Sequence, residues 1–600
     1  MTIPESFKKE AGLFTGRLGR AFLLGLIVLL ALNGAVFASS SGDTKNTPAS
    51  DKDKAADTTE THKGDSATTA APAAKRAPLT TDEQVQVLSE KVKKLEEIID
   101  RQQKALDAIQ NQSKVGAVEP AAATSSTIPG APATATAAGT TAAAGSAPVA
   151  PVKSAQGDES ESPLQLKIGK AYITPVGFAD FTMVFRSTNT GSGIGTNFGS
   201  IPFSNTAQGR LTETKFSAQN SRIGFRVDAN VHGAHVLGYM EEDFLGAAPG
   251  NFQVTSNSNA QRMRLYWVDV RKDKWEILGG QSWSMMTPGR NGISGLPGDI
   301  FYAQNMDTNY QLGLVWSRAA QFRLIYHPTK TIAWGFAVEN PDQYIGGSGG
   351  GGVITIPAAF AGSYANQLDS GNGGTAVPNL HPDFQTKIAF DPMVGGKHQH
   401  IEFAGVVRSF KALNTIANKS NTTIGGGGSV NLNLEIFKNF HLISNNYYSA
   451  GGGRYIFGLA PDVVVRGDGT LSLVNSGSTI DGFEATVNKT LIYGYYGGVY
   501  VDRNTVIDPS NLKPVGYGFP GSPSSNNRAM HEATFGVTQT LWKDPKWGAL
   551  QLITQYSYVL RHPWAVATGA PGDAHTNMFF FDLRFSLPGN PPKESELMGK

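Results

Sequence analysis

From about residue 165 to residue 587, apolar and polar side chains alternate along many short segments. Successive side chains of a β-strand point to opposite faces, so this period of two predicts strands with one apolar and one polar face. The last segment is the clearest, with Phe579, Phe581, Leu583, Phe585 and Leu587 on one face and Asp582, Arg584 and Ser586 on the other. The same alternation recurs at 172–186, 221–228 and 430–436. The chain is therefore predicted to be all-β over most of its length.

The alternating segments predict sixteen strands. They fall at 172–186, 214–228, 233–244, 261–271, 275–284, 318–327, 331–339, 383–391, 399–410, 428–437, 440–449, 482–489, 491–501, 530–541, 548–560 and 576–587. Tight connections at 271–274, 327–330, 438–439 and 543–547 alternate with long segments at 187–213, 245–260, 285–317, 340–382, 450–481 and 502–529. This asymmetry is typical of outer-membrane barrels, which have short periplasmic turns and long external loops. An even number of strands places both ends of the barrel in the periplasm.

A soluble β-sandwich would also show alternation, and the connection lengths favour a barrel instead. No water is available in a bilayer to pair backbone groups, so a membrane-spanning sheet must close on itself. Aromatic residues are expected at the two interfaces of such a barrel. Seven tryptophans lie at or near predicted strand ends: Trp267, Trp275, Trp283, Trp316, Trp542, Trp547 and Trp564. The predicted fold class is a closed antiparallel transmembrane β-barrel of about sixteen strands.

Residues 1–38 read as a secretory signal peptide. A basic region with Lys8, Lys9, Arg17 and Arg20 precedes an unbroken apolar run at 21–32, and Ala38 offers a cleavage point. The alternative is an uncleaved membrane anchor, but the apolar run is shorter than the roughly 20 residues of a spanning helix. Export of the mature chain is therefore predicted.

Three segments of different composition lie between the predicted signal peptide and the predicted barrel. Residues 39–80 are polar and predicted to be disordered, 81–112 carry a heptad pattern, and 113–164 form an Ala/Thr/Pro linker. The heptad seam is made of Val85, Leu88, Val92, Leu95, Ile99, Gln102, Leu106 and Ile109. So narrow a stripe predicts a coiled coil that self-associates in the periplasm, with a lone amphipathic helix as the alternative. Residues 165–587 are then the barrel and 588–600 a C-terminal tail.

Composition excludes several classes of function. The 51 Lys+Arg residues balance 49 Asp+Glu residues, which argues against a nucleic-acid binder. The absence of Cys excludes a thiolate metal site and a catalytic thiol. The Gly346–Gly350 stretch matches a nucleophile elbow only formally, His398 and His400 lack further metal ligands, and no phosphate loop or dinucleotide motif is present. No enzyme activity, cofactor or metal is predicted.

The alternation also predicts which charged side chains face the barrel interior. The basic set is Arg222, Arg226, Arg262, Arg264, Arg323, Lys387, Arg408 and Arg584, and the acidic set is Asp180, Glu241, Asp243, Glu402, Glu435 and Asp582. The third long loop, 285–317, is predicted to fold inward and narrow the pore with Arg290, Asp299 and Asp307; the alternative is an ordinary external loop.

Two pairs of arginines are expected to point the same way. Arg262 and Arg264 are two residues apart, and Arg222 and Arg226 are four apart, so each pair shares a strand face. The planar guanidinium fork matches a carboxylate with two parallel hydrogen bonds. The hypothesis is a weak selectivity for small anions, guided by these arginines. The alternative is that they pair with Glu241, Asp243 and Glu402 and only stiffen the wall.

Several short stretches resemble the DcaP-like porins. They are 221–228 (SRIGFRVD), 262–266 (RMRLY), 279–284 (GGQSWS), 337–341 (AVENP) and 451–456 (GGGRYI). The resemblance implies a homotrimeric, sixteen-stranded channel in the outer membrane of a Gram-negative-type bacterium, in contact with lipid and lipopolysaccharide. It also implies passage of small anions, dicarboxylic acids among them. One departure is the tail, because residues 586–600 follow the aromatic residue that usually ends such a chain.

A porin is the first hypothesis for function. The second is a structural or adhesive outer-membrane protein, in which the coiled coil tethers the barrel to the cell wall. A filled interior would favour the second hypothesis, and an open polar bore would favour the first.

Overall fold

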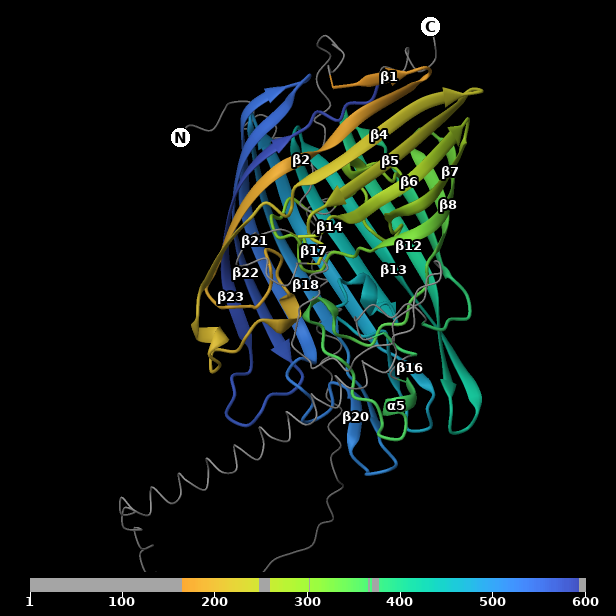
Figure 1. Ribbon diagram of the computed structural model, residues 1–600, viewed down its shortest axis with the longest axis vertical. Coiled ribbons are helices and arrows are strands. Elements are labelled where there is room, and N and C mark those ends of the chain that lie inside the picture. Colours follow the sequence, from red (N-terminus) through yellow and green to blue (C-terminus); the bar gives the residue numbers. More distant parts are fainter. Residues whose placement is uncertain (1–163, 248–258, 302, 365–366, 370–376, 593–600) are drawn as a thin grey trace, which may run out of the picture. The chain divides into compact units, whose positions relative to one another are not determined.

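The computed structural model describes residues 164–247, 259–301, 303–364, 367–369 and 377–592 (Figure 1). The predicted signal peptide, polar segment and coiled coil lie outside the described residues, as do nearly all of the linker and the last part of the tail. None of the helices within the described residues is both long and apolar enough to cross a membrane.

The described chain forms one closed antiparallel barrel of sixteen strands, which confirms the predicted fold class. Its strands are β2 (Ala171–Arg186), β3 (Glu213–Ser217) together with β4 (Arg222–Val231), β5 (Ala234–Asp243), β6 (Arg262–Lys272), β7 (Trp275–Trp283), β8 (Arg318–Thr329), β9 (Ile332–Glu339), β10 (Asp383–Phe390), β12 (Lys397–Asn414), β13 (Lys419–Phe437), β14 (Phe440–Ala450), β17 (Asn475–Val487), β18 (Thr490–Val501), β21 (Asn527–Asp544), β22 (Gly548–Pro563) and β23 (Ala574–Ser586). The barrel closes where β23 pairs with β2, from Phe178 opposite Ser586 to Arg186 opposite Met578.

Short elements add to the barrel at its edges and in its loops. They are β1 (Leu166–Ile168), β11 (Met393–Val394), the hairpins β15 (Val463–Val465) with β16 (Leu471–Leu473) and β19 (Asn504–Ile507) with β20 (Pro514–Tyr517), and the single-turn helix α5 (Ala361–Tyr364). Both hairpins lie in long loops, so these loops have hydrogen-bonded structure of their own.

The two ends of the barrel differ in the length of their connections. At one end tight turns join β4 to β5, β13 to β14 and β17 to β18, with positive φ at His232, Asn439 and Asn488. Positive φ gives these turns the twist that matches neighbouring strands. β2 begins and β23 ends at this short-turn end, at the top of Figure 1, and the long loops lie at the bottom.

The strand boundaries differ most from the sequence prediction at three places. β17 begins at Asn475, within the segment 450–481 that was predicted to be a long loop. Residues 411–427 were expected to connect two strands, but β12 and β13 continue through them and turn at 415–418. The Gly- and Thr-rich stretch there shows no apolar alternation, because this part of the hairpin extends beyond the 9–11 residues that cross a bilayer. The predicted strand at 214–228 is interrupted at 218–221, and β2 pairs with both of its halves.

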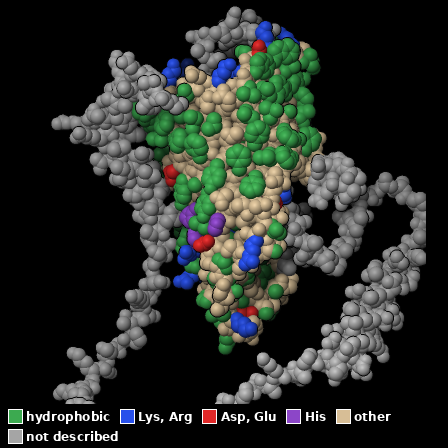
Figure 2. Space-filling model, turned by 90° about the vertical axis from the view of Figure 1, so that its left-hand side faces the viewer, with side chains coloured by type: hydrophobic (Ala, Val, Ile, Leu, Met, Phe, Trp, Pro, Cys, Tyr) green, Lys and Arg blue, Asp and Glu red, His purple; other side chains and the backbone are tan. Residues whose placement is uncertain are grey.

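The alternation places apolar side chains on the outside of the barrel. In β23 the outward Phe579, Phe581, Leu583 and Phe585 are 37–42 % exposed, whereas Asp582 and Arg584 between them are at most 3 % exposed. Figure 2 shows hydrophobic side chains covering much of the upper part of one face, with charged ones at its upper rim and from its middle downward. The outer surface therefore matches the apolar belt of a membrane barrel.

The tryptophans do not all lie in interfacial belts as predicted. Trp275, Trp542 and Trp547 are about half exposed on the outside, as expected for a belt. Trp267, Trp283 and Trp316 are instead buried in the interior. Trp283 packs against Trp316 with 6.2 Å between ring centroids and against Tyr310 with 5.8 Å, because a loop fills the barrel at this level.

An arginine on the outer face is expected to destabilise the barrel according to its depth. Phe581→Arg should lower the free energy of unfolding by about 2–4 kcal/mol, because the charge replaces an apolar group near the middle of the belt. Leu413→Arg, on the part of β12 beyond the bilayer, is the matched control and should cost less than about 1 kcal/mol. Denaturant unfolding in lipid vesicles measures both, and equal losses would contradict the placement of the belt.

Candidate functional site

The third long loop crosses the interior of the barrel. This inner loop, residues 284–317, leaves β7 and returns in β8. Midway it contacts strands across the interior: the Met306 amide donates to Gln555 of β22 at 2.6 Å, and the Leu312 amide donates to Glu532 of β21 at 2.8 Å. The inner loop therefore narrows the space that the strands enclose.

Glycines allow the inner loop to approach the wall closely. A Cβ on Gly497 of β18 would lie 1.9 Å from the carbonyl oxygen of Leu312. Gly313 has φ +93°, and a Cβ there would lie 2.4 Å from the carbonyl oxygen of Thr479. Real side chains do not fit at such distances, so backbone meets backbone at this contact.

A buried carboxylate joins the inner loop to the first long loop. Asp307 accepts hydrogen bonds from the amides of Thr196, at 3.0 and 3.1 Å, and Asn309, at 2.8 Å. The Asn309 side chain donates in turn to the Thr196 carbonyl at 2.9 Å. Burial raises the pKa of Asp307, although Arg186 and these hydrogen bonds favour its charged form. The two loops are thus held together inside the barrel.

The beginning of the inner loop is fixed to the wall by charged groups. Arg290 donates to both carboxylate oxygens of Glu484 on β17, at 2.9 and 2.7 Å. The Gly289 amide donates to Glu402 of β12 at 3.2 Å, and the Gly292 amide donates to Asp391 at 3.1 Å. The sequence identified Arg290 as a constriction residue, and here it anchors the loop.

Asp299, the remaining predicted constriction residue, lies within the same loop. Its backbone carbonyl accepts from the Arg290 amide at 2.6 Å, and the Asn291 side chain donates to its carboxylate at 3.4 Å. Burial raises the pKa of this carboxylate. Asp299 therefore helps to shape the loop around Arg290.

All the charged residues predicted for the interior except Arg226, Arg262 and Glu435 are buried, and all the basic ones except Arg323 form ion pairs. The pairs are Arg222–Glu241 at 3.3 Å, Arg226–Asp228 at 2.6 Å, Arg262–Asp243 at 2.7 Å, Arg264–Glu241 at 2.7 Å and Arg264–Asp243 at 2.8 Å, Lys387–Glu402 at 3.0 Å, Arg408–Asp383 at 3.0 Å and Arg408–Asp462 at 2.8 Å, and Arg584–Asp180 at 2.6 Å and Arg584–Asp582 at 3.1 Å. These contacts correspond to the wall-stiffening alternative. Glu435 accepts from the amides of His398 and Asn439, so it secures the short-turn end.

One region of the wall carries more positive than negative charge. We call Arg222, Arg262, Arg264 and Arg318 the arginine cluster; the carboxylates of Glu241 and Asp243 lie among them. The guanidinium of Arg318 lies over Trp283 at 5.4 Å and over Trp316 at 5.6 Å. The Arg262 side chain is 24 % exposed. Arg262 is thus the most exposed of the three arginines of the cluster that form ion pairs.

Sequence alternation missed Arg318. In β8 the inward residues are odd-numbered, such as Gln321, Arg323 and Ile325, so Arg318 should have faced outward. It stands at the first position of the strand, where the alternation does not yet hold. Its neighbours in the sequence, Trp316 and Ala320, did not indicate that its side chain points inward.

A second missed group is centred on Arg454. This residue of the loop between β14 and β17 contacts Asp383 at 3.0 Å, Glu339 at 3.5 Å and Asp342 at 3.8 Å. The hydroxyl oxygen of the neighbouring Tyr455 lies 2.9 Å from a carboxylate oxygen of Glu339 and 2.9 Å from one of Asp383, and burial raises the pKa of Tyr455. The signal for this group was the GGGRYI stretch. Its arginine and tyrosine tie the loop to the ends of β9 and β10.

Within the described ranges, no group of three or more His, Cys, Asp or Glu residues is arranged to hold a metal ion. His398 and His400 both contact Asp391, at 3.3 and 2.7 Å, and His400 also contacts Glu402. This network joins the turn after β10 to the start of β12.

Comparison with solved structures identifies the architecture. The crystal structure of the outer membrane channel DcaP of Acinetobacter baumannii matches 70 % of this chain and 99 % of that chain, with a TM-score of 0.51 and 16 % identity. The chain has the fold of the DcaP channel. An anion-selective porin from Comamonas acidovorans matches 70 % of this chain and 100 % of that chain, with a TM-score of 0.40 and 12 % identity. No protein-family model and no curated protein matches the sequence.

The shared fold agrees with the resemblance of the sequence to the DcaP-like porins. Four of the five similar stretches lie in or beside β4, β6, β7 and β9, and the fifth, at 451–456, carries Arg454. Two of them contribute Arg222, Arg262 and Arg264 to the arginine cluster.

Removing the carboxylate that joins the two loops should loosen the inner loop. In Asp307→Ala the buried amides of Thr196 and Asn309 lose their acceptor, which costs about 1–3 kcal/mol for each unpaired group. Faster amide hydrogen exchange at both residues is the expected result, measured by mass spectrometry of the detergent-solubilised protein. Asp573→Ala, an exposed carboxylate of the last loop, is the control and should leave exchange in the inner loop unchanged.

Proposed function

We propose that this protein is an outer-membrane porin through which small hydrophilic solutes diffuse passively. The observation that carries the proposal is a closed sixteen-stranded barrel with an apolar outer belt, an interior of polar and charged side chains, and an inner loop across that interior. A structure that spans a bilayer with strands must close in this way, and its interior is free to be wet. The signal-peptide pattern at 1–38 supports export.

We further propose a preference for small anions, such as dicarboxylates. The ion pairs of the wall cancel most of the interior charge, so the preference depends on the arginine cluster, where four guanidinium groups surround two carboxylates. Arg262 is the most exposed of its ion-paired members, and its fork suits a carboxylate. An excess of positive charge beside a narrow path raises the local concentration of anions.

Single-channel recording tests both parts of the proposal. In a KCl gradient across a planar bilayer, the wild-type reversal potential should show anion preference, and Arg262→Ala with Arg264→Ala should shift it toward cations. Arg271→Ala, an exposed arginine at the turn end of the same strand, is the matched control and should leave the potential unchanged. A cation-selective wild type, or no shift in the double variant, would contradict the anion preference; absence of conductance would contradict the porin.

We also propose a homotrimer, joined in part by the predicted coiled coil at 81–112 on the periplasmic side. A polar cluster on the outer face of β14 and β17 supports a protein partner within the bilayer. Ser444 and Thr479 donate to Asp481 at 2.7 and 2.9 Å, and Asn446 donates to Ser444. A carboxylate facing lipid is costly, so ionisable groups on such surfaces usually meet protein.

Two variants separate the two contributions to the trimer. Deletion of 81–112 and the substitution Asp481→Lys should each lower the fraction of trimer, measured by native mass spectrometry in detergent. Glu242→Lys, which reverses a charge on β5 away from this cluster, is the control and should leave the fraction of trimer unchanged. Monomers in the wild type would contradict the proposed assembly.

The second candidate is a structural or adhesive outer-membrane protein. A specific observation favours it: loops fill much of the interior, and Tyr310, Trp316 and Phe457 belong to one buried cluster that reaches across it. A plugged barrel would give no conductance steps in the bilayer experiment, and this result separates the two candidates.

A further inference from the structure

Arg323 differs from the other predicted basic residues of the interior. It lies on the inner face of β8, is 1 % exposed, and has no carboxylate oxygen within 4 Å among the described residues. Its Nε donates to Gln321 at 2.6 Å, and its Nη2 donates to the carbonyl of Trp283. Glu339, Glu276 and Asp269 act on it only from a greater distance. The charge of this side chain is therefore buried without a direct counter-ion.

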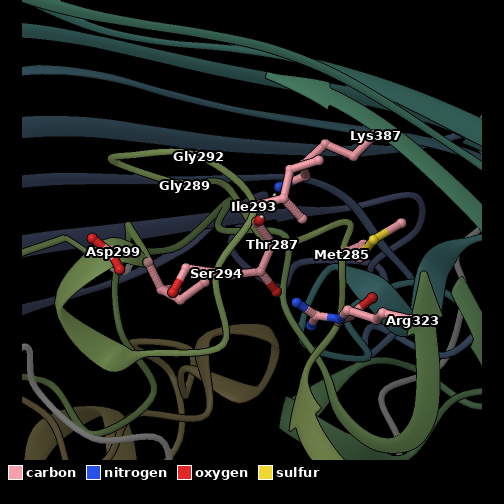
Figure 3. A pocket seen from close by; sticks show the side chains of 11 residues that line it. Met285, Thr287, Gly289, Gly292, Ile293, Ser294, Asp299, Arg323 and Lys387 are labelled. Carbon is pink, nitrogen blue, oxygen red and sulfur yellow. Dashed lines mark hydrogen bonds between the residues drawn. The ribbon is translucent and has the colours of Figure 1, made fainter. Parts of the chain in front are cut away.

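A small pocket lies beside this guanidinium, between the inner loop and the wall. It is lined by residues of the inner loop together with Arg323 of β8 and Lys387 of β10 (Figure 3). Its volume of about 10 Å³ admits one group of the size of a water molecule. In Figure 3 the Arg323 side chain extends toward Thr287 of the inner loop.

Two donors of the pocket have no hydrogen-bond acceptor in the described part of the chain. Nη1 of Arg323 makes no hydrogen bond, whereas the other two guanidinium nitrogens do. The Thr287 hydroxyl is fully buried and has no partner. Buried polar groups are nearly always satisfied, so the unsatisfied Thr287 hydroxyl, beside a guanidinium that has no carboxylate in contact, points to a ligand that accepts hydrogen bonds.

The nearby charges allow a small anion. Lys387 is paired with Glu402, and its ammonium also donates to the Thr287 carbonyl at 2.7 Å. Asp299 lines the pocket as well, but Figure 3 places it beyond Ser294, on the side away from Arg323. A ligand in the pocket would thus lie closest to positively charged groups and to a hydroxyl. Asp299, the one carboxylate in the lining, would lie farther away.

We propose that this pocket binds a single chloride ion, held by Nη1 of Arg323 and the hydroxyl of Thr287. The space admits at most a monatomic anion, and a dicarboxylate or a phosphate is too large for it. The ion supplies the counter-charge that Arg323 lacks, and it joins the inner loop to β8 near the start of the loop. Chloride is here a structural ligand of the constriction, separate from any anion that passes through it.

Bromide, which replaces chloride and scatters anomalously, tests the site in crystals of the mature chain. The expected result is an anomalous peak between Arg323 and Thr287 in the wild type, lost in Arg323→Met, which keeps the side-chain length and removes the charge. Arg271→Met, at the turn end of β6, is the control and should retain the peak. A wild-type pocket that holds water alone, or an equal peak in Arg323→Met, would overturn the proposal.

A solution measurement covers the case in which Arg323→Met does not fold. Chloride should raise the midpoint of thermal unfolding of the wild type relative to gluconate at equal ionic strength, because a ligand of the folded state stabilises it. Thr287→Val keeps the charge of Arg323 and removes the hydroxyl, so it should reduce this shift; an undiminished shift would overturn the site. Both experiments measure binding, so their failure is distinct from an absence of conductance.

Discussion

The hydrogen-bonded seam between β2 and β23 is the constraint on which the rest of the structure depends. Once these strands pair, every barrel strand has two neighbours and no edge is left with unpaired amides and carbonyls. Only then is an apolar outer face compatible with a bilayer, since hydrocarbon offers the backbone no other partners. Closure also creates an interior. This interior must accommodate every strand side chain that points away from the lipid.

The chain fills that inside largely with opposite charges held together. Arg584, Asp180 and Asp582 span the closing seam itself, and Lys387 with Glu402 joins β10 to β12. A buried charge is costly unless it is paired and hydrogen-bonded, and the pairs on the inner wall meet this requirement across neighbouring strands. At the arginine cluster and at Arg323, positive charge exceeds the carboxylates in contact with it. The proposed anion preference and the proposed chloride site depend on these groups.

The inner loop narrows the space enclosed by the barrel strands. Contacts on three sides fix its position. Arg290 and Glu484 fix its start, Asp307 joins it to the first loop, and Glu532 holds its far end. Glycine at position 497 makes the last contact close enough for backbone to meet backbone. The proposed solute path depends on all three contacts, because loosening any of them would change the width of the space between the inner loop and the wall.

The sequence by itself determined the strands, their number and their two faces, because the alternation of apolar and polar residues is a local property of the chain. The lipid requires this alternation only in the part of each strand that lies within the membrane. It also placed charges such as Arg264 and Glu241 on the inner face and marked the third long loop. Tertiary structure alone decided which charges pair, since Arg408 and Asp462 are far apart in the chain and meet only in the closed barrel. It also decided the inward position of Arg318 and of Trp283, at strand ends where alternation gives no direction. The hairpin at 411–427 was hidden because a strand beyond the bilayer has no need of an apolar face.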